Sequence, residues 1–101
     1  MAAGGPGPIS EFEWDEAKAA ANLRKHGVAF AYSARVFADP DRIERLDDSG
    51  YPDEERWKVI GLIETRVYVV VYTERAGRRR LISARRAARS ERELYHDHLS
   101  A

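Results

Sequence analysis

Three strand-length segments follow one another with only short turns between them: "RWKVIGLI" (56–63), "VYVVVYTE" (67–74) and "RRRLISA" (78–84). The connecting turns are too short for a crossover, so consecutive strands must run antiparallel. The middle segment is almost entirely apolar, which is typical of a strand buried on both faces. The sequence therefore predicts an antiparallel meander at the centre of the domain.

Two helices are expected before the meander. Asp15 can accept the free amides of a helix over 16–26, and Gly27 can end that helix in the left-handed conformation. A second helix is expected within 29–40, because Phe30, Ala34 and Phe37 form an apolar stripe at helical spacing. Pro40 bars its continuation.

The remaining segments complete an α+β layout. "EFEW" (11–14) and "RIERL" (42–46) alternate polar and apolar residues and predict two short strands. "ARSERELYHDHL" (88–99) predicts a C-terminal helix, with Ser90 and Glu93 in a capping box. We expect an antiparallel sheet of four to five strands with two N-terminal helices and one C-terminal helix, all on one sheet face.

Composition limits the classes of protein that this chain can represent. Its 101 residues fit one small domain over 11–98, preceded by a flexible N-terminal tail over 1–10, "MAAGGPGPIS". The chain has no cysteine, which excludes disulfides and cysteine-rich zinc sites. No apolar run approaches the ~18 residues of a membrane span. We expect a cytoplasmic protein with no membrane contact.

Charge is distributed unevenly although the formal net charge is zero. Residues 39–55 contain eight acidic residues and two arginines, whereas residues 75–92 contain eight arginines and one acid, Glu91. A focused positive patch can bind polyanions even in a neutral protein. Alternatively, the acidic stretch pairs with the arginines and both are solvated surface.

The arginines of "RRRLISARR" (78–86) are the strongest candidates for binding. Strand alternation places four side chains on one face: Arg79, Leu81, Ser83 and Arg85. It places four on the other: Arg80, Ile82, Ala84 and Arg86. An arginine fork matches a phosphate bidentately.

The neighbouring strand adds aromatic side chains to this surface. Tyr68 and Tyr72 share a face, and Arg75 lies just past the strand's end. Tyrosines can stack on unpaired bases beside a phosphate-binding arginine. The same strands can instead pack their tyrosines into the core with the arginines at the rim.

Histidines offer limited chemistry. The two histidines of "HDH" (96–98) are two residues apart, so they do not face each other on a helix and no metal site is expected. His26 lies beside Lys25 at the expected C-terminus of the first helix, where the helix dipole favours the imidazolium. His26 is therefore a candidate proton donor or phosphate contact, or simply an exposed cap residue.

Together these motifs resemble the BrnT toxins, the ribonuclease half of BrnT/BrnA type II toxin–antitoxin modules. The matching stretches are "FEWDEAKAAANLRKHGVAF" (12–30), "VFADP" (36–40), "ERWKVIG" (55–61), "VVVYTER" (69–75) and "LISARRAARSERELY" (81–95). Two positions depart from the family pattern: Ala29 stands where a Ser or Thr is frequent, and Ala88 where a Thr is frequent. Each departure would lose a helix cap worth ~1 kcal/mol.

The resemblance implies a RelE-like fold, bacterial origin and a ribonuclease activity that blocks translation without a metal or other cofactor. It also implies neutralisation by BrnA, a ribbon-helix-helix DNA-binding antitoxin that represses its own operon in complex with the toxin. The RNA's own 2′-hydroxyl would attack the adjacent phosphate, and the protein would stabilise charge and move protons.

Catalytic roles are assigned on this basis. Arg85 and Arg75 contact the phosphate, His26 with Lys25 serves proton transfer or leaving-group stabilisation, and Glu55 is the candidate carboxylate base. The residues expected to bind RNA are Arg79, Arg80, Arg86, Tyr72 and Trp57. For Glu55 the alternative is a loop residue paired to an arginine, and for Trp57 it is core packing.

The main rival hypothesis is a non-catalytic module. A degenerate toxin whose basic face docks RNA or an acidic protein would carry the same arginines. A DNA-binding repressor is a third hypothesis, although no helix-turn-helix pattern is evident and the second expected helix carries only Arg35.

Overall fold

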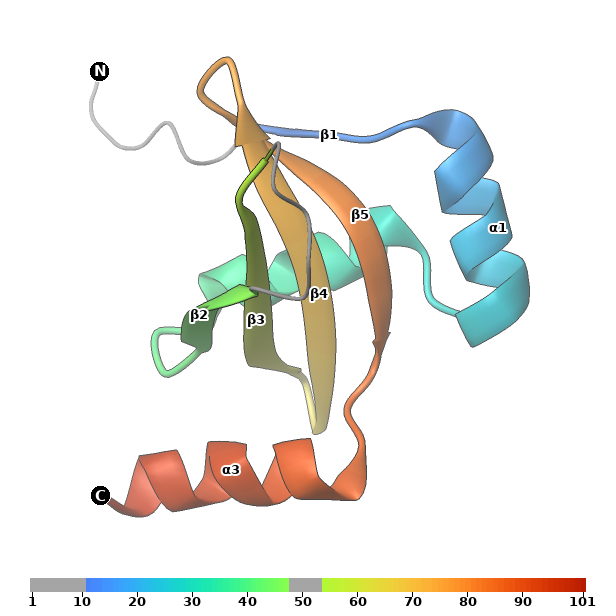
Figure 1. Cartoon of the computed structure of the whole chain (residues 1–101). Coiled ribbons are helices and arrows are strands. Elements are labelled where there is room, and N and C mark those ends of the chain that lie inside the picture. The colour runs from blue at the N-terminus through green and yellow to red at the C-terminus, as the bar shows by residue number, and fades with distance from the viewer. Residues whose placement is uncertain (1–10, 48–53) are drawn as a thin grey trace.

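A five-stranded sheet forms the centre of the molecule, in the order β1–β5–β4–β3–β2 (Figure 1). This computed structural model describes residues 11–47 and 54–101. The tail predicted over 1–10 lies outside the described residues. The strands are β1 (Phe12–Glu13), β2 (Ile43–Asp47), β3 (Arg56–Ile63), β4 (Arg66–Arg75) and β5 (Arg78–Arg86).

Strands β2 to β5 form the predicted antiparallel meander, but the sheet as a whole is mixed. β1 runs parallel to β5, pairing Phe12 with Arg79 and Glu13 with Arg80. The prediction of a purely antiparallel sheet is therefore wrong at this edge. Short turns fix the strand directions in the meander, whereas β1 is separated from β5 by most of the chain and no turn constrains it.

Helix α1 (Glu16–His26) begins and ends as the sequence predicts. The backbone amide of Lys18 donates to the Asp15 carboxylate at 3.0 Å, and Gly27 ends the helix at φ 70°. The second predicted helix is instead two short pieces, α2 (Phe30–Ser33) and a 3₁₀ helix, η2 (Ala34–Ala38). Ala29 is at the N-cap position of α2 and makes no side-chain hydrogen bond there, as expected where alanine replaces a Ser or Thr.

Close packing of η2 against the sheet depends on Gly61 in the middle of β3. A Cβ at Gly61 would lie 3.1 Å from Val36 Cβ and 3.3 Å from the Val36 carbonyl oxygen. Such contacts are tighter than ordinary van der Waals packing, so a larger residue would push η2 away from the strand. Val36 itself is fully buried.

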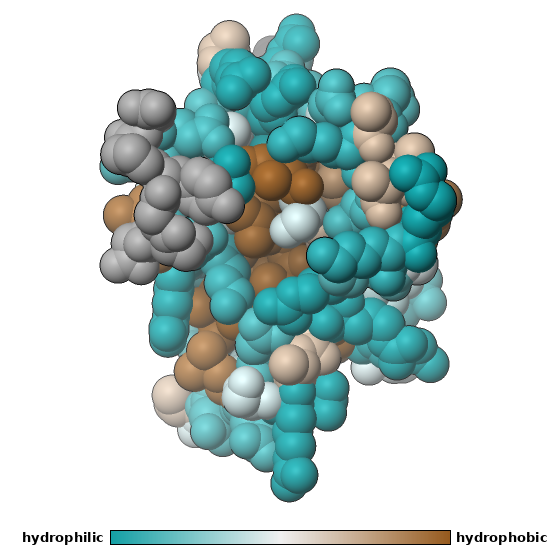
Figure 2. All heavy atoms as spheres, turned by 45° about the vertical axis from the view of Figure 1, so that its right-hand side comes forward, coloured by the Kyte–Doolittle hydropathy of each residue, from teal (hydrophilic) through white to brown (hydrophobic). Residues whose placement is uncertain are grey.

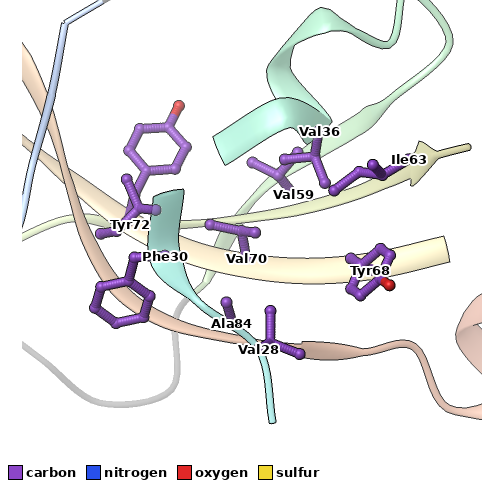
Figure 3. Packing of buried hydrophobic residues seen from close by; sticks show 10 residues of the cluster. Val28, Phe30, Val36, Val59, Ile63, Tyr68, Val70, Tyr72 and Ala84 are labelled. Atoms are coloured by element: carbon purple, nitrogen blue, oxygen red, sulfur yellow. The ribbon is translucent and has the colours of Figure 1, made fainter. Parts of the chain in front are cut away.

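The first core lies between the sheet and the three N-terminal helical segments (Figure 3). We call this face of the sheet the helix side. Its buried members are Val28, Phe30, Val36, Val59, Ile63, Tyr68, Val70, Tyr72, Leu81 and Ala84. They come from α2 and Val28 just before it, from η2, and from β3, β4 and β5, so this core joins the N-terminal half of the domain to the meander.

Helix α3 (Arg89–Ser100) packs on the opposite face of the sheet, which we call the front face. Its Tyr95 is buried with Ile60, Val67 and Val69, whose side chains alternate with those of the helix side. In Figure 1, α3 lies across the lower end of the strands. The prediction that all helices share one face is wrong, because β4 is apolar on both faces and each face needs cover.

A hydrogen bond anchors α3 to the other layer. Tyr95 Oη donates to Asp39 Oδ2 at 2.5 Å, and the same oxygen accepts the Leu62 amide at 2.8 Å. Burial alone would raise the pKa of Asp39, but these bonds and the Asp41 amide outweigh it and lower that pKa. The carboxylate therefore stays ionised and fixes where α3 crosses the sheet.

An irregularity in β5 decides which arginines face which way. Val71 pairs with Ser83 but Tyr72 pairs with Leu81, so Ile82 is an extra residue in a β-bulge. At this bulge the alternation of β5 side chains between the two faces of the sheet shifts by one residue. The helix side receives Arg79, Leu81, Ala84 and Arg86, and the front face receives Arg80, Ser83 and Arg85. The predicted grouping of Arg79 with Ser83 and Arg85 is therefore wrong.

The amide side chain of Asn22 fastens α1 to the edge of β5. Asn22 Nδ2 donates to the carbonyl oxygens of Val28 and Ala84, both at 2.9 Å, and Oδ1 accepts the Ala84 amide at 3.1 Å. β1 pairs with β5 only at Arg79 and Arg80, so the Asn22 amide satisfies the strand edge at Ala84.

We predict that Asn22→Ala lowers the free energy of unfolding by about 2–4 kcal/mol, because it leaves buried backbone groups of Ala84 and Val28 without partners. Urea denaturation measures this change. Leu23→Ala is the control, since Leu23 is 51% exposed and its truncation is expected to cost less than about 1 kcal/mol. Equal losses for the two variants would contradict this role for Asn22.

Candidate functional site

Three charged side chains from different elements meet on the front face. Glu91 of α3 accepts two hydrogen bonds from Arg85 of β5, Nη1 to Oε1 and Nη2 to Oε2, each 2.8 Å long. Lys58 of β3 places its Nζ 3.2 Å from Glu91 Oε2. One carboxylate therefore lies between a guanidinium fork and an ammonium group, and it joins strands that are not neighbours in the sheet.

Glu91 also begins helix α3. The backbone amide of Ala88 donates to Glu91 Oε1 at 2.7 Å, so Glu91 supplies the acidic half of a capping box. The predicted box of Ser90 and Glu93 is wrong by two residues, and Glu93 instead pairs with Arg89 at 3.2 Å. The helix start thus sets the position of the carboxylate that meets Arg85.

Partial burial makes these interactions strong. The side chain of Glu91 is 13% exposed, and those of Lys58 and Arg85 are each 37% exposed. The hydrogen bonds from Arg85, followed by those from the Ala88 amide and Lys58, outweigh burial and lower the pKa of Glu91 to about 2. Glu91 in turn raises the pKa of Arg85. The cluster therefore holds one anion beside two cations at neutral pH.

A cavity of about 310 Å³ adjoins this cluster, between α3 and the sheet. Its lining residues are Ile43, Arg45, Lys58, Ile60, Ser90, Glu91 and Leu94. Figure 2 turns the right-hand side of Figure 1 forward and shows a mostly hydrophilic surface with a recessed hydrophobic area in its upper half, above the level of α3. Because Lys58 and Glu91 line the cavity together with Ile43, Ile60 and Leu94, charged groups and an apolar recess lie side by side on the front face.

Three of the predicted RNA-binding residues are packed on the helix side: Arg79, Tyr72 and Trp57. The Arg79 guanidinium lies 4.2 Å from the ring centre of Phe37 and 5.4 Å from that of Tyr72. Tyr72 is buried, and its Oη donates to Glu44 Oε1 at 2.8 Å. Burial and that carboxylate raise the pKa of Tyr72 to about 12. Trp57 pairs with Tyr72 on the same face and is partly buried.

Arg75 and Glu55 lie at the other end of the meander. Arg75 Nη2 is 3.5 Å from Glu54 Oε1. A second cavity, of about 450 Å³, is lined by Glu54, Glu55, Trp57, Thr73, Glu74 and Arg75. Val69 pairs with Arg85, and Arg75 is six residues further along β4, which corresponds to roughly 20 Å. Arg75 and Arg85 are therefore too far apart to contact one phosphate.

The remaining predicted residues are dispersed. Lys25 and His26 end α1, which contacts β5 from the helix side. Arg80 faces the front and pairs with Glu13 at 3.0 Å, whereas Arg86 is exposed on the helix side, opposite Tyr68. Arg85 is thus the member of the predicted catalytic set that belongs to the front-face cluster.

Comparison with known proteins identifies the family. A family model described as the ribonuclease toxin, BrnT, of a type II toxin–antitoxin system matches residues 14–91, about three quarters of the chain. The chain belongs to this BrnT family. The matched region contains Lys58, Arg85 and Glu91 together. No curated protein matches the sequence. Within the described residues, no helix is long and apolar enough to span a membrane.

The sequence patterns nominated Arg85 but did not indicate Lys58 and Glu91 as its partners. Lys58 stands in a strand where it looks like an ordinary surface residue, and Glu91 is the one acid among eight arginines. A usable signal was present for Glu91. Glu91 follows Ala88 by three residues, which is the spacing of the acidic member of a capping box.

We predict that Glu91 makes stability depend on acid pH. Its folded-state pKa of about 2 lies below its ordinary value of 4.5, so its contribution is complete above pH 4.5 and is lost as the pH falls towards 2. Glu91→Gln should lower the free energy of unfolding by about 2–3 kcal/mol at neutral pH. This deficit should shrink steadily below pH 4.5 in urea denaturation series.

Glu93→Gln is the matched control for this measurement. Glu93 is on the same helix, its side chain is 62% exposed and it pairs with one arginine. Its substitution should change stability by less than about 0.5 kcal/mol at every pH. A Glu91→Gln deficit that stays constant from pH 7 to pH 2 would contradict the charged cluster.

Proposed function

We propose that this BrnT toxin is a metal-independent endoribonuclease that inhibits translation by cleaving RNA. The observation that carries the proposal is the meeting of Arg85, Lys58 and Glu91 on the front face of a ribonuclease-toxin chain. RNA cleavage by an adjacent 2′-hydroxyl needs charge stabilisation and proton transfer, and two cations and a carboxylate can supply both.

The proposed reaction is a transesterification. The 2′-oxygen attacks the adjacent phosphorus, its proton passes to a base, and the bond from phosphorus to the 5′-oxygen breaks. The departing 5′-oxygen takes up a proton. The products are a 2′,3′-cyclic phosphate and a free 5′-hydroxyl. No electron donor or acceptor is needed, and charge on the phosphate rises in the transition state.

Each residue of the cluster suits one part of this reaction. The Arg85 fork can hold two phosphate oxygens, and Lys58 can neutralise the added charge and protonate the leaving oxygen. Glu91 is ionised at neutral pH and can accept the 2′-proton once a phosphate has drawn the cations away from it. Its low pKa makes it a weak base while it is paired, so substrate binding itself would raise its basicity.

The roles first considered for other residues are revised accordingly. Arg75 and Glu55 would contact a different part of the RNA, if they contact it, because they lie at the far end of the sheet. His26 and Lys25 approach β5 from the helix side, and Arg80 and Arg86 are proposed as contacts to flanking phosphates. Tyr72, Trp57 and Arg79 are proposed to support the core.

Membership of the BrnT family supports a proposal for the partner of this toxin. A type II system pairs the toxin with a protein antitoxin. We propose a BrnA-type antitoxin of ribbon-helix-helix fold, through which the complex binds operator DNA in the bacterial cytoplasm. The mixed sheet with helices on both faces supports a RelE-like fold.

Incubation of the purified protein with end-labelled RNA in excess EDTA tests the activity. Cleavage that leaves 2′,3′-cyclic phosphate ends is expected. Cleavage that requires added Mg²⁺ and leaves 5′-phosphate ends would overturn the proposal. RNA binding without cleavage, both alone and on translating ribosomes, would favour the alternative of a non-catalytic binding module.

We predict that Arg85→Ala lowers the cleavage rate by about a hundredfold or more, because one transition-state contact is worth ~2.7–4 kcal/mol. Arg66→Ala is the matched control: the same residue type, exposed at the start of β4 and on the helix side, for which less than about a fivefold loss is expected. Circular dichroism checks that each variant is folded. Similar losses in the two folded variants would show that the front face is not the site.

A further inference from the structure

The cavity beneath α3 has a lining that the proposed cleavage chemistry does not use. Its apolar surface comes from Ile43 of β2, Ile60 of β3 and Leu94 of α3. Ile60 is buried, and the other two are partly buried beside it. An apolar recess at the surface costs free energy unless something apolar fills it.

The lining fits an aliphatic side chain better than a nucleobase. None of the residues that line it is aromatic, whereas unpaired bases are usually held by stacking on aromatic rings. At about 310 Å³ the cavity lies at the small end of ligand sites. A branched aliphatic side chain presents the matching shape and has no polar edge to leave unsatisfied.

Charged side chains at the rim of the cavity determine which residues can flank the inserted aliphatic side chain. Arg45 of β2 is exposed and forms no salt bridge with any residue of 11–47 or 54–101. Lys58 lies at the same rim and shares Glu91 with Arg85. The rim therefore carries an excess of positive charge, which favours carboxylates on either side of the inserted residue.

We propose that this cavity is the docking site of the antitoxin, through an acidic segment that inserts one aliphatic side chain beneath α3. Type II membership supplies the partner, and the apolar floor and basic rim supply the chemistry that recognises it. A segment seated there would cover Lys58 and Glu91. Its inhibitory effect rests on the proposed function, because it blocks RNA from the front-face cluster.

Methyl-labelled toxin titrated with two acidic heptapeptides tests this docking. One peptide carries a central leucine between glutamates, and the other carries serine at that position. The leucine peptide should shift the methyl resonances of Ile43, Ile60 and Leu94 and bind at least about tenfold more tightly than the serine peptide. Arg45→Glu should weaken it by about tenfold, and Arg24→Glu, on exposed α1, should not.

A second pair of variants tests whether a larger side chain at the mouth of the cavity blocks peptide binding, while the apolar lining residues stay unchanged. Ser90 lines the mouth and is exposed, so Ser90→Leu should reduce leucine-peptide binding by about tenfold, whereas Ser100→Leu at the far end of α3 should not. Equal affinity for the two peptides, or shifts that map to another surface, would overturn the docking site. So would a 2′-O-methyl RNA that shifts the same three methyl groups while neither peptide does.

The methyl shifts do not depend on catalysis, so the two proposals fail separately. Peptide binding in the cavity without RNA cleavage would leave the docking site standing and remove the ribonuclease. RNA cleavage without peptide binding would retain the ribonuclease and remove the docking site. Peptide inhibition of cleavage, stronger for leucine than for serine, is expected where both hold.

Discussion

The paired hydrogen bonds between Arg85 and Glu91 hold the two halves of the front face together. They connect the last strand to the helix that follows it, and the same carboxylate binds Lys58 and the first amide of α3. Removing Glu91 alone would destabilise the fold, because two cations would lose their partner, but replacing the whole cluster with well-packed apolar residues would cost little stability. A carboxylate shared by two cations on an open face is therefore better explained by what it can bind than by what it stabilises.

The β-bulge at Ile82 determines which arginines of β5 lie on the front face with Glu91. Without the extra residue, strand alternation would place Arg79 beside Arg85 on one face. With it, Arg79 lies on the helix side between Phe37 and Tyr72, and Arg80 and Ser83 share the front face with Arg85. One inserted residue thus separates an arginine that packs in the core region from arginines that face solvent.

The two-sided hydrophobicity of β4 fixes the layers around the sheet. α2 and η2 cover one face through Phe30 and Val36, and α3 covers part of the other through Tyr95. α3 crosses one end of the front face, and the side chains of Lys58 and Arg85 beside it are each 37% exposed. The Tyr95–Asp39 hydrogen bond fixes that crossing, and so it also positions Glu91 and the cavity beneath α3.

Local patterns predicted local structure well. The Asp15 cap, the Gly27 terminus and the short turns fixed α1 and the meander, because each depends on neighbouring residues alone. The bulge, the parallel β1 pairing and the side chosen by α3 depend on contacts between distant segments, which no local pattern records. For the same reason Arg85 could be nominated from the sequence, but its partners Lys58 and Glu91 could not.

The most direct test of the account is where a scissile phosphate binds. A short 2′-O-methyl RNA cannot supply the attacking hydroxyl, so its complex with the wild-type toxin can be mapped by nuclear magnetic resonance and by crystallography. The account predicts a phosphate within hydrogen-bonding distance of Arg85 and Lys58, with Glu91 released from Arg85 and turned towards the 2′-oxygen. A phosphate bound instead at Arg75 and Glu55, with the Arg85–Glu91 pair intact, would contradict it.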